Sequence, residues 1–209
     1  MIDLKHRVVY IHIPKTGGTS IESYFQEVLN IPDEALPALG VFINGKGSPL
    51  ERQNGHNTLG MYERYYFNGP IPEDFRVFAV VRNPIKRFWS EYNWRRLPPP
   101  RRFPIHSTLP ANLLIRLSEK PIPILKDLNS HMRPQHTYLE GESLSRVRIL
   151  RQETLSDDFA AMCRDWGLPN TPLPRSNTSP KQRPVKNREK IENWVRTFYA
   201  EDFKRFGYE

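Results

Sequence analysis

The chain has 209 residues, which is enough to bury a core and suits one domain of α/β size. Its 31 lysines and arginines exceed its 23 acidic residues, and the net charge of +8 favours anionic partners such as nucleic acids, membrane surfaces, or phosphorylated and sulfated molecules. The single cysteine, Cys163, excludes a disulfide framework and any zinc site built from several cysteines.

Targeting segments are not evident in the sequence. Residues 1–15 hold no apolar segment followed by a cleavage site, and no run of about 18 apolar residues occurs. We therefore expect a cytoplasmic protein without a membrane span.

The first half of the chain predicts two strands, each followed by a helix. Residues 7–13 are β-branched and apolar up to Pro14, which indicates a buried strand, and a helical spacing of apolar residues begins at about Thr19. Residues 31–56 are rich in glycine and predict loops. Residues 76–81 predict a second buried strand.

The helix after the second strand begins with Asn83 and Pro84, which are typical of an N-cap and a first helical turn. Its apolar stripe consists of Ile85, Phe88, Trp89 and Tyr92.

The second half continues the alternation of strands and helices. Residues 146–150 predict a third strand, and the helix behind it ends at Gly167. A last helix is predicted over 187–205. Three strand–loop–helix segments favour an α/β fold with a mainly parallel sheet, in which ligands bind at the carboxyl ends of the strands. The candidate ligand-binding junctions are 14–20, 82–83 and 151–153.

The first junction, "PKTGGTS" at 14–20, has the composition of a phosphate-binding loop. Gly17 and Gly18 allow the backbone to approach a ligand closely, and Lys15 adds a positive charge. Thr16, Thr19 and Ser20 add hydroxyl groups. The lysine precedes the glycines here, whereas it follows them in the Walker A pattern. The alternative is an ordinary strand-to-helix turn with a capping threonine.

The second junction also predicts anion binding. The strand ends in Arg82, where a P-loop kinase or ATPase would usually need an aspartate for magnesium. Asn83, Arg87 and Ser90 then share one helix face. Two anion sites without a metal-binding carboxylate indicate a ligand with two separated phosphate-type groups. A solvated basic face is the alternative interpretation.

These two motifs, "HIPKTGGTS" and "VFAVVRNPIKRFWSEY", resemble the PAPS-dependent sulfotransferases, most closely the family 2 type that acts on carbohydrates and glycosaminoglycans. Weaker likeness continues through 131–139, 147–159, 173–179 and 198–208. The resemblance implies a P-loop-like three-layer fold with a small, mainly parallel sheet flanked by helices, in a single domain over 1–209.

The resemblance also implies a donor and its contacts. The donor would be 3′-phosphoadenosine 5′-phosphosulfate (PAPS), the product PAP, and no metal would be required. The loop residues Lys15, Thr16, Gly17, Gly18, Thr19 and Ser20 would hold the 5′-phosphosulfate. Arg82 and Ser90 would hold the 3′-phosphate.

A general base should accept the proton of the acceptor hydroxyl, and histidine suits this role because its pKa lies near neutrality. His56 lies in a "GH" context similar to that of the base in the family, and we expect it to be catalytic together with Lys15. His131 is the alternative base, and His131, Arg133 and His136 are candidate substrate contacts. His12 lies within the first strand and is interpreted as structural. Glu22 is a weaker candidate base.

The acceptor is expected to be a hydroxyl of a carbohydrate or glycoconjugate. The basic tract at 95–102 would bind an anionic acceptor or form a solvated loop. Lys181 and Arg183 lie in a segment that covers the nucleotide in family members. The alternative functions are a P-loop nucleotide kinase or NTPase, a PAP-binding protein without catalysis, and a nucleic-acid-binding module, which the aromatic residues on apolar helix faces disfavour.

Overall fold

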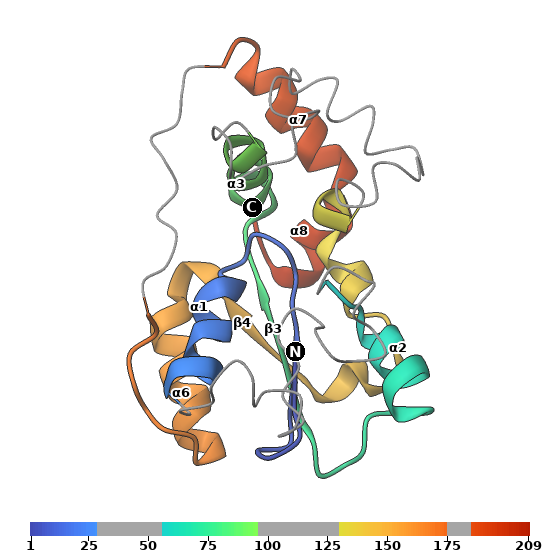
Figure 1. Ribbon diagram of the computed structural model, residues 1–209. Helices are drawn as coiled ribbons and strands as arrows, with labels where there is room; N and C mark the ends of the chain where they lie inside the picture. The colour runs from blue at the N-terminus through green and yellow to red at the C-terminus, as the bar shows by residue number, and fades with distance from the viewer. Residues whose placement is uncertain (29–55, 96–129, 175–184) are drawn as a thin grey trace. The chain divides into compact units, whose positions relative to one another are not determined.

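The computed structural model describes residues 1–28, 56–95, 130–174 and 185–209 (Figure 1). The chain divides into two compact units, Met1–Val81 with Gln135–Ser176 and Arg82–Pro134 with Asn177–Glu209. Lys181, Arg183, most of the loop-rich segment 31–56 and most of the basic tract at 95–102 lie outside the described residues. That the chain is a single domain stays a prediction.

A four-stranded sheet forms the centre of the first unit. Its strands lie in the order β1 (Ile2–Asp3), β2 (Val8–Ile11), β3 (Arg76–Val81) and β4 (Val147–Arg151). β1 is antiparallel to β2, whereas β2, β3 and β4 run parallel. The predicted α/β class with a mainly parallel sheet is confirmed. β1 was not predicted, because two residues are too few to show an alternating pattern.

Helices flank this sheet (Figure 1). On one side lie α1 (Gly18–Ser23), which continues as the π-helical segment η1 (Tyr24–Val28), and α6 (Leu155–Trp166). On the other side lies α2 (Leu59–Tyr62), which continues as η5 (Glu63–Phe67). Short 3-10 segments are η8 (Gln135–Tyr138), η9 (Glu142–Arg146) and η10 (Gln152–Thr154). The predicted stop of α6 is confirmed, since Gly167 has a φ of 64°.

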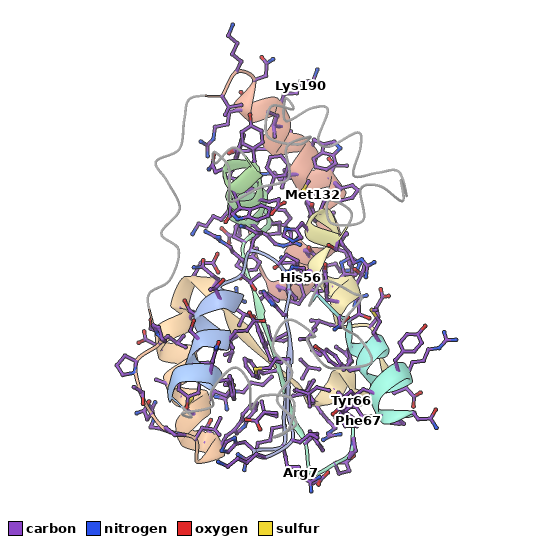
Figure 2. The ribbon with its side chains drawn as sticks, in the orientation of Figure 1. Arg7, His56, Tyr66, Phe67, Met132 and Lys190 are labelled. Atoms are coloured by element: carbon purple, nitrogen blue, oxygen red, sulfur yellow. The ribbon has the colours of Figure 1, made fainter. Side chains whose placement is uncertain are left out.

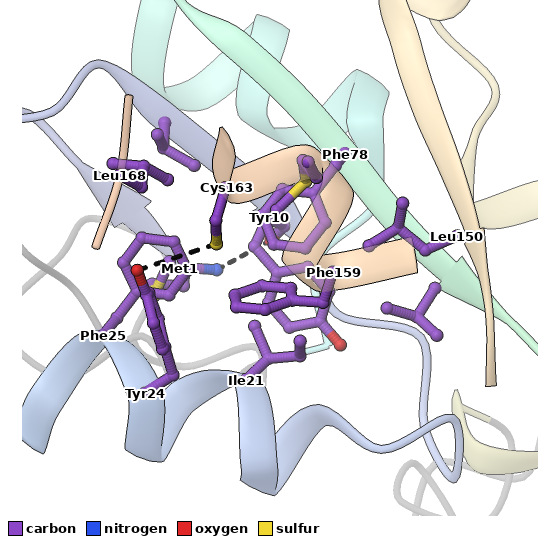
Figure 3. Close-up of a cluster of buried hydrophobic side chains, with 13 residues drawn as sticks. Met1, Tyr10, Ile21, Tyr24, Phe25, Phe78, Leu150, Phe159, Cys163 and Leu168 are labelled. Atoms are coloured by element: carbon purple, nitrogen blue, oxygen red, sulfur yellow. Dashed lines mark hydrogen bonds between the residues drawn. The ribbon is translucent and has the colours of Figure 1, made fainter. Parts of the chain in front are cut away.

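The core between the sheet and α1 with α6 follows from the alternation of side chains along the strands. Val8 and Tyr10 of β2 belong to one buried cluster with Phe78, and the rings of Tyr10 and Phe78 stack at 4.8 Å (Figure 3). Burying one such ring contributes about 1.5–3 kcal/mol. The same alternation directs His12, two residues after Tyr10, toward α1.

The second unit packs α3 (Pro84–Arg95), α7 (Arg188–Phe198) and α8 (Ala200–Phe206). Its buried cluster comprises Phe88, Trp89, Tyr92, Met132, Ile191, Val195 and Tyr199. The N-cap of α3 is confirmed, because Asn83 Oδ1 accepts hydrogen bonds from the amides of Ile85 at 3.0 Å and Lys86 at 3.3 Å. Within the described ranges, no helix has both the length and the apolarity to cross a membrane.

The C-terminal helical segment differs from its prediction. The single helix expected over 187–205 is two helices that meet at Tyr199, whose φ of −103° and ψ of 24° leave the helical region. The Tyr199 side chain is buried, and its hydroxyl donates to the carbonyl of Met132 at 2.7 Å. The hydrogen bond holds the Tyr199 side chain where the two helices meet.

Candidate active site

The loop after β2 has the backbone geometry of an anion-binding turn. Lys15 has a φ of 68° and Gly17 a φ of 102°. Positive φ is uncommon for a residue with a side chain, and left-handed residues in such a turn gather successive amide groups into a concavity that suits an anion. Lys15, Gly17 and Ser20 are half-buried and Thr19 is exposed, so the polar groups of the loop reach solvent.

Two groups that the sequence offers to a ligand are already engaged within the loop. Thr16 is buried, and its hydroxyl donates to the carbonyl of Ile13 at 2.8 Å. The amide of Ser20 donates to the carbonyl of Gly17 at 3.0 Å. Thr16 would therefore contribute its backbone to an anion, and its hydroxyl stabilises the loop.

The structure brings two of the predicted junctions together. A Cβ atom on Gly17 would lie 2.9 Å from Leu155 Cδ2 and 4.0 Å from Gln152 Cγ. The loop at 14–20 thus packs against the segment that follows β4, as expected where parallel strands end at one edge of a sheet.

A buried histidine–glutamate pair lies behind the loop. His12 Nδ1 is 2.9 Å from Glu22 Oε1, and both residues are buried. Gly18 and Glu22 are one turn apart on α1, so they lie on the same helix face. The His12 ring contacts both, because a Cβ atom on Gly18 would lie only 1.9 Å from His12 Nε2. Both ring nitrogens of His12 therefore face protein atoms, which suits the interpretation of His12 as structural.

The charge of this pair follows from its surroundings. Burial tends to raise the pKa of the Glu22 carboxyl, but the charge of His12 and its hydrogen bond hold that pKa below the ordinary value of 4.5. Glu22 is therefore ionised at neutral pH, and the shared proton lies on His12 Nδ1.

His56 lies against His12. The two ring centroids are 4.6 Å apart and the planes meet at 80°, an edge-to-face contact. His56 is half-buried and its Nδ1 is buried, so a reaction at this ring would use Nε2. In Figure 2 His56 lies at one end of the strands of the first unit and Arg7 at the other.

The residues after His56 fix its position. Asn57 is buried directly after His56. Thr58 caps α2, because its hydroxyl oxygen accepts from the amide of Met61 at 3.2 Å. The structure thus brings His56, His12 and the start of α1 together in one unit.

The second junction belongs to the second unit. Arg82 and Ser90 are both half-buried. Arg87, by contrast, does not line an anion-facing surface as the sequence predicts. It is buried, and its guanidinium donates to the carbonyls of His131 at 2.8 Å and Arg133 at 2.9 Å. The guanidinium is thus engaged by the backbone of the neighbouring segment.

The three candidate substrate contacts fall in different environments. His131 is buried, with Nδ1 2.8 Å from Glu91 Oε2 and its ring stacked on Trp94 at a centroid distance of 5.5 Å. Arg133 is exposed in the same unit. His136 is half-buried on η8 of the first unit.

Sequence reasoning missed the partnership of His12, Glu22 and His56. Two signals could have revealed part of it. His12 is two residues after Tyr10, so their side chains point to the same side of the sheet, which is the side covered by α1. Gly18 and Glu22 are four residues apart, so the glycine and the carboxylate lie one turn apart on the same helix face. The contact with His56 could not be predicted, because it depends on the tertiary path of the chain.

Each of the two junctions, taken by itself, offers donors that suit an anion. The loop offers an ammonium group, hydroxyls and backbone with left-handed residues, and the second junction offers a guanidinium and a hydroxyl. The described residues contain no group of three or more His, Cys, Asp and Glu side chains that could hold a metal ion.

The structure thus has an α/β fold in which a loop with left-handed residues follows a parallel strand. A protein-family model described as "Sulfotransferase family" matches residues 1–209. The chain therefore belongs to the sulfotransferase family, and it is a transferase of sulfuryl groups. The search of curated proteins and the search of solved structures found no match.

Proposed function

We propose that this sulfotransferase takes its sulfuryl group from PAPS and transfers it to a hydroxyl of a carbohydrate or glycoconjugate. The observation that carries the proposal is the loop at 14–20, where left-handed Lys15 and Gly17 follow a parallel strand in a chain matched throughout by the family. The net charge of +8 supports an anionic donor and suits an acidic acceptor.

In this proposal the loop binds the 5′-phosphosulfate. Lys15 and the backbone of the loop stabilise the negative charge that grows on the leaving phosphate as the bond to sulfur breaks. Because such groups act mainly in the transition state, removing one lowers the rate by about 10²–10³-fold. Gly18 suits this position because a Cβ atom there would lie 1.9 Å from His12 Nε2 and would force the ring to move.

Arg82 and Ser90 bind the 3′-phosphate in the same proposal. A guanidinium can donate two parallel hydrogen bonds to a phosphate, and a serine hydroxyl can add a third. These contacts distinguish a 3′-phosphorylated nucleotide from ATP or ADP, since only the former carries a phosphate at that position.

His56 acts as the general base. PAPS supplies an electrophilic sulfur: the acceptor oxygen bonds to it while the bond to the 5′-phosphate breaks, and that electron pair leaves with PAP. His56 Nε2 takes the proton of the attacking hydroxyl, which makes the oxygen a better nucleophile. The neutral imidazole is the active form, so activity rises with pH through the pKa of His56.

An acceptor screen with sulfur-labelled PAPS tests this function. We expect label in acidic glycans for the wild-type protein and for Lys190→Ala, which changes an exposed lysine on α7. Lys15→Ala should lower the transfer by about 10²–10³-fold. Wild-type turnover in Lys15→Ala would refute the role of the loop, and transfer of phosphate from ATP would favour a kinase.

Calorimetry with PAP tests the nucleotide assignment separately. Arg82→Ala should weaken PAP binding by about 10-fold or more, whereas binding of adenosine 5′-phosphosulfate, which lacks the 3′-phosphate, should change little. Arg205→Ala, which removes an exposed ion pair with Glu201, is the control and should leave both affinities unchanged. Equal weakening of both nucleotides by Arg82→Ala would contradict a 3′-phosphate contact.

A further inference from the structure

We propose that Glu22 and His12 form a pair that positions His56. The pair holds the His56 ring in place and increases its proton affinity. The inference rests on the proposed function in that His56 is taken as the base. The coupling among the three side chains can nevertheless be measured without turnover.

The geometry of the pair leaves His12 no freedom to turn. Its Nδ1 is hydrogen-bonded to Glu22, and its Nε2 edge is pressed against the backbone of Gly18. Tyr10 stacks against one ring face at a centroid distance of 5.5 Å. The His12 ring is thus held on three sides, and the His56 ring packs against it with the two ring planes at 80°.

Three ionisable groups near the pair, the hydroxyls of Tyr10 and Tyr62 and the amino group of Met1, carry no charge at neutral pH. Burial raises the pKa of Tyr10 and of Tyr62 well above the ordinary value, so both hydroxyls are neutral. Burial lowers the pKa of the Met1 amino group, which donates to the Tyr62 hydroxyl at 2.7 Å, to about 5, so this group is also neutral at pH 7.

Glu22, in contrast, keeps its charge because His12 holds the pKa of its carboxyl low. Lys15 in the loop carries the opposite charge. In a partly desolvated site a carboxylate behind the first ring favours protonation of a second ring in contact with it. In this proposal the carboxylate of Glu22 thus increases the proton affinity of the His56 ring, which favours its action as a base.

A merely structural pair makes a different prediction. If Glu22 and His12 only support the fold, replacing Glu22 lowers stability and leaves the titration of His56 unchanged. If they position and polarise His56, the same replacement shifts that titration. The direction is fixed: losing a nearby negative charge lowers the pKa of a histidine.

The test is an NMR titration of the histidine rings, with the His56 signal assigned from its loss in His56→Gln. Glu22→Gln keeps an acceptor for His12 Nδ1 but removes the charge, and we expect the His56 midpoint to fall by about 0.5–1 pH unit. Asp3→Asn is the matched control, because Asp3 forms a similar pair with His6 in the same unit. It should leave the His56 midpoint unchanged. An unchanged midpoint in folded Glu22→Gln would overturn the proposal.

A second variant covers the case in which Glu22→Gln does not fold. The double variant His12→Phe with Glu22→Leu keeps the aromatic contact with His56 and replaces the buried pair by apolar groups, a change that folded proteins often tolerate. It should lower the His56 midpoint as Glu22→Gln does. Glu22→Asp restores the charge on a shorter side chain and should recover part of the shift.

The pH profile of kcat completes the experiment. The acid limb should move to lower pH in Glu22→Gln by the same amount as the NMR midpoint. A shift by NMR without any sulfuryl transfer by the wild-type protein would refute the proposed function but leave the pair intact. Transfer with an unshifted acid limb and an unshifted midpoint would refute the pair alone.

Discussion

Each of the two units buries a histidine–glutamate pair. Both pairs have the same kind of hydrogen bond, from histidine Nδ1 to a glutamate oxygen, but the surroundings of the histidine differ. In the first unit His12 Nδ1 lies 2.9 Å from Glu22, and in the second His131 Nδ1 lies 2.8 Å from Glu91. His12 is pressed against the Gly18 backbone and contacts a second histidine, whereas His131 is stacked on an indole.

The second pair, His131 with Glu91, helps to connect α3 to the segment at 131–133. Glu91 and Arg87 lie one turn apart on α3, and both bind residues of the 131–133 segment, Glu91 through the His131 ring and Arg87 through two carbonyls. This arrangement anchors the segment to the helix that follows the second junction. The comparison shows that a hydrogen bond to a carboxylate does not by itself define the role of a buried histidine. The residues that contact the histidine ring define that role.

The largest expected effect separates the two histidines that could serve as the base. His56→Ala should lower kcat by about 10²–10⁴-fold and leave PAP binding unchanged, because a general base contributes in the transition state. His131→Ala should retain much more of kcat. Steady-state kinetics and PAP calorimetry on both variants provide the measurement. A reversal, in which His131→Ala loses turnover and His56→Ala keeps it, would transfer the role to the second unit.

The next largest effect is expected when the His12 ring of the first pair is displaced by a substitution at Gly18. Gly18→Ala places a Cβ atom 1.9 Å from His12 Nε2, so the ring must move, and we expect a loss of about 1–3 kcal/mol of stability together with most of the activity. Gly167→Ala is the control, since its Cβ meets nothing within 4 Å but its φ is 64°.

Strain at that positive φ should cost Gly167→Ala about 1 kcal/mol without affecting turnover. Urea unfolding and the transfer assay together distinguish the two variants. Full activity in Gly18→Ala would mean that the His12 ring can leave its position without consequence.

A smaller effect is expected for the charge of the second pair. Glu91→Gln keeps an acceptor for His131 but removes the charge of a buried hydrogen bond, which should cost about 1–2 kcal/mol of stability. The proposal attributes the proton affinity of His56 to the first pair, which it contacts, so we expect the His56 titration to stay unchanged in Glu91→Gln. Urea unfolding measures the first quantity and NMR the second. Glu201→Gln, on an exposed surface pair, should change neither. A shifted midpoint of the His56 titration in Glu91→Gln would mean that the charge of Glu91, and not only that of Glu22, affects the protonation of His56.

Local signals carried most of what could be predicted from the sequence. The β-branched run before Pro14, the Asn83 cap and the Gly167 stop each depend on residues a few positions apart, and the structure confirms them. The family resemblance depends on two short motifs and is confirmed over the whole chain. These features were accessible because hydrogen bonding and steric restriction act within one or two turns of the backbone.

Non-local features could not be predicted in the same way. Arg87 has a polar side chain on an amphipathic helix, and only the position of the carbonyls at 131 and 133 shows that it is buried. The hydrogen bond of Tyr199 at the break between α7 and α8 is likewise non-local, since its partner is Met132. The roles of Lys15, His56, Arg82 and Ser90 stay predictions, because they concern a ligand and a reaction.

The smallest effect concerns the pH dependence of stability and bears on the first pair directly. The folded-state pKa of Glu22 lies below the ordinary value of 4.5, so between the two pKa values the unfolded chain binds more protons than the folded protein. The stability that Glu22 contributes is therefore complete above pH 4.5 and is lost as the pH falls through the folded-state pKa.

Thermal unfolding of the wild-type protein and of Glu22→Gln should show this loss as a difference in Tm that narrows on acidification below pH 4.5. Glu140→Gln, which changes an exposed carboxylate, should give a difference near zero at every pH. A constant difference between wild type and Glu22→Gln from pH 7 to pH 3 would mean that the charge of Glu22 is not stabilised by His12. The first pair would then resemble a neutral hydrogen bond, and the reason for expecting Glu22 to act on His56 would disappear.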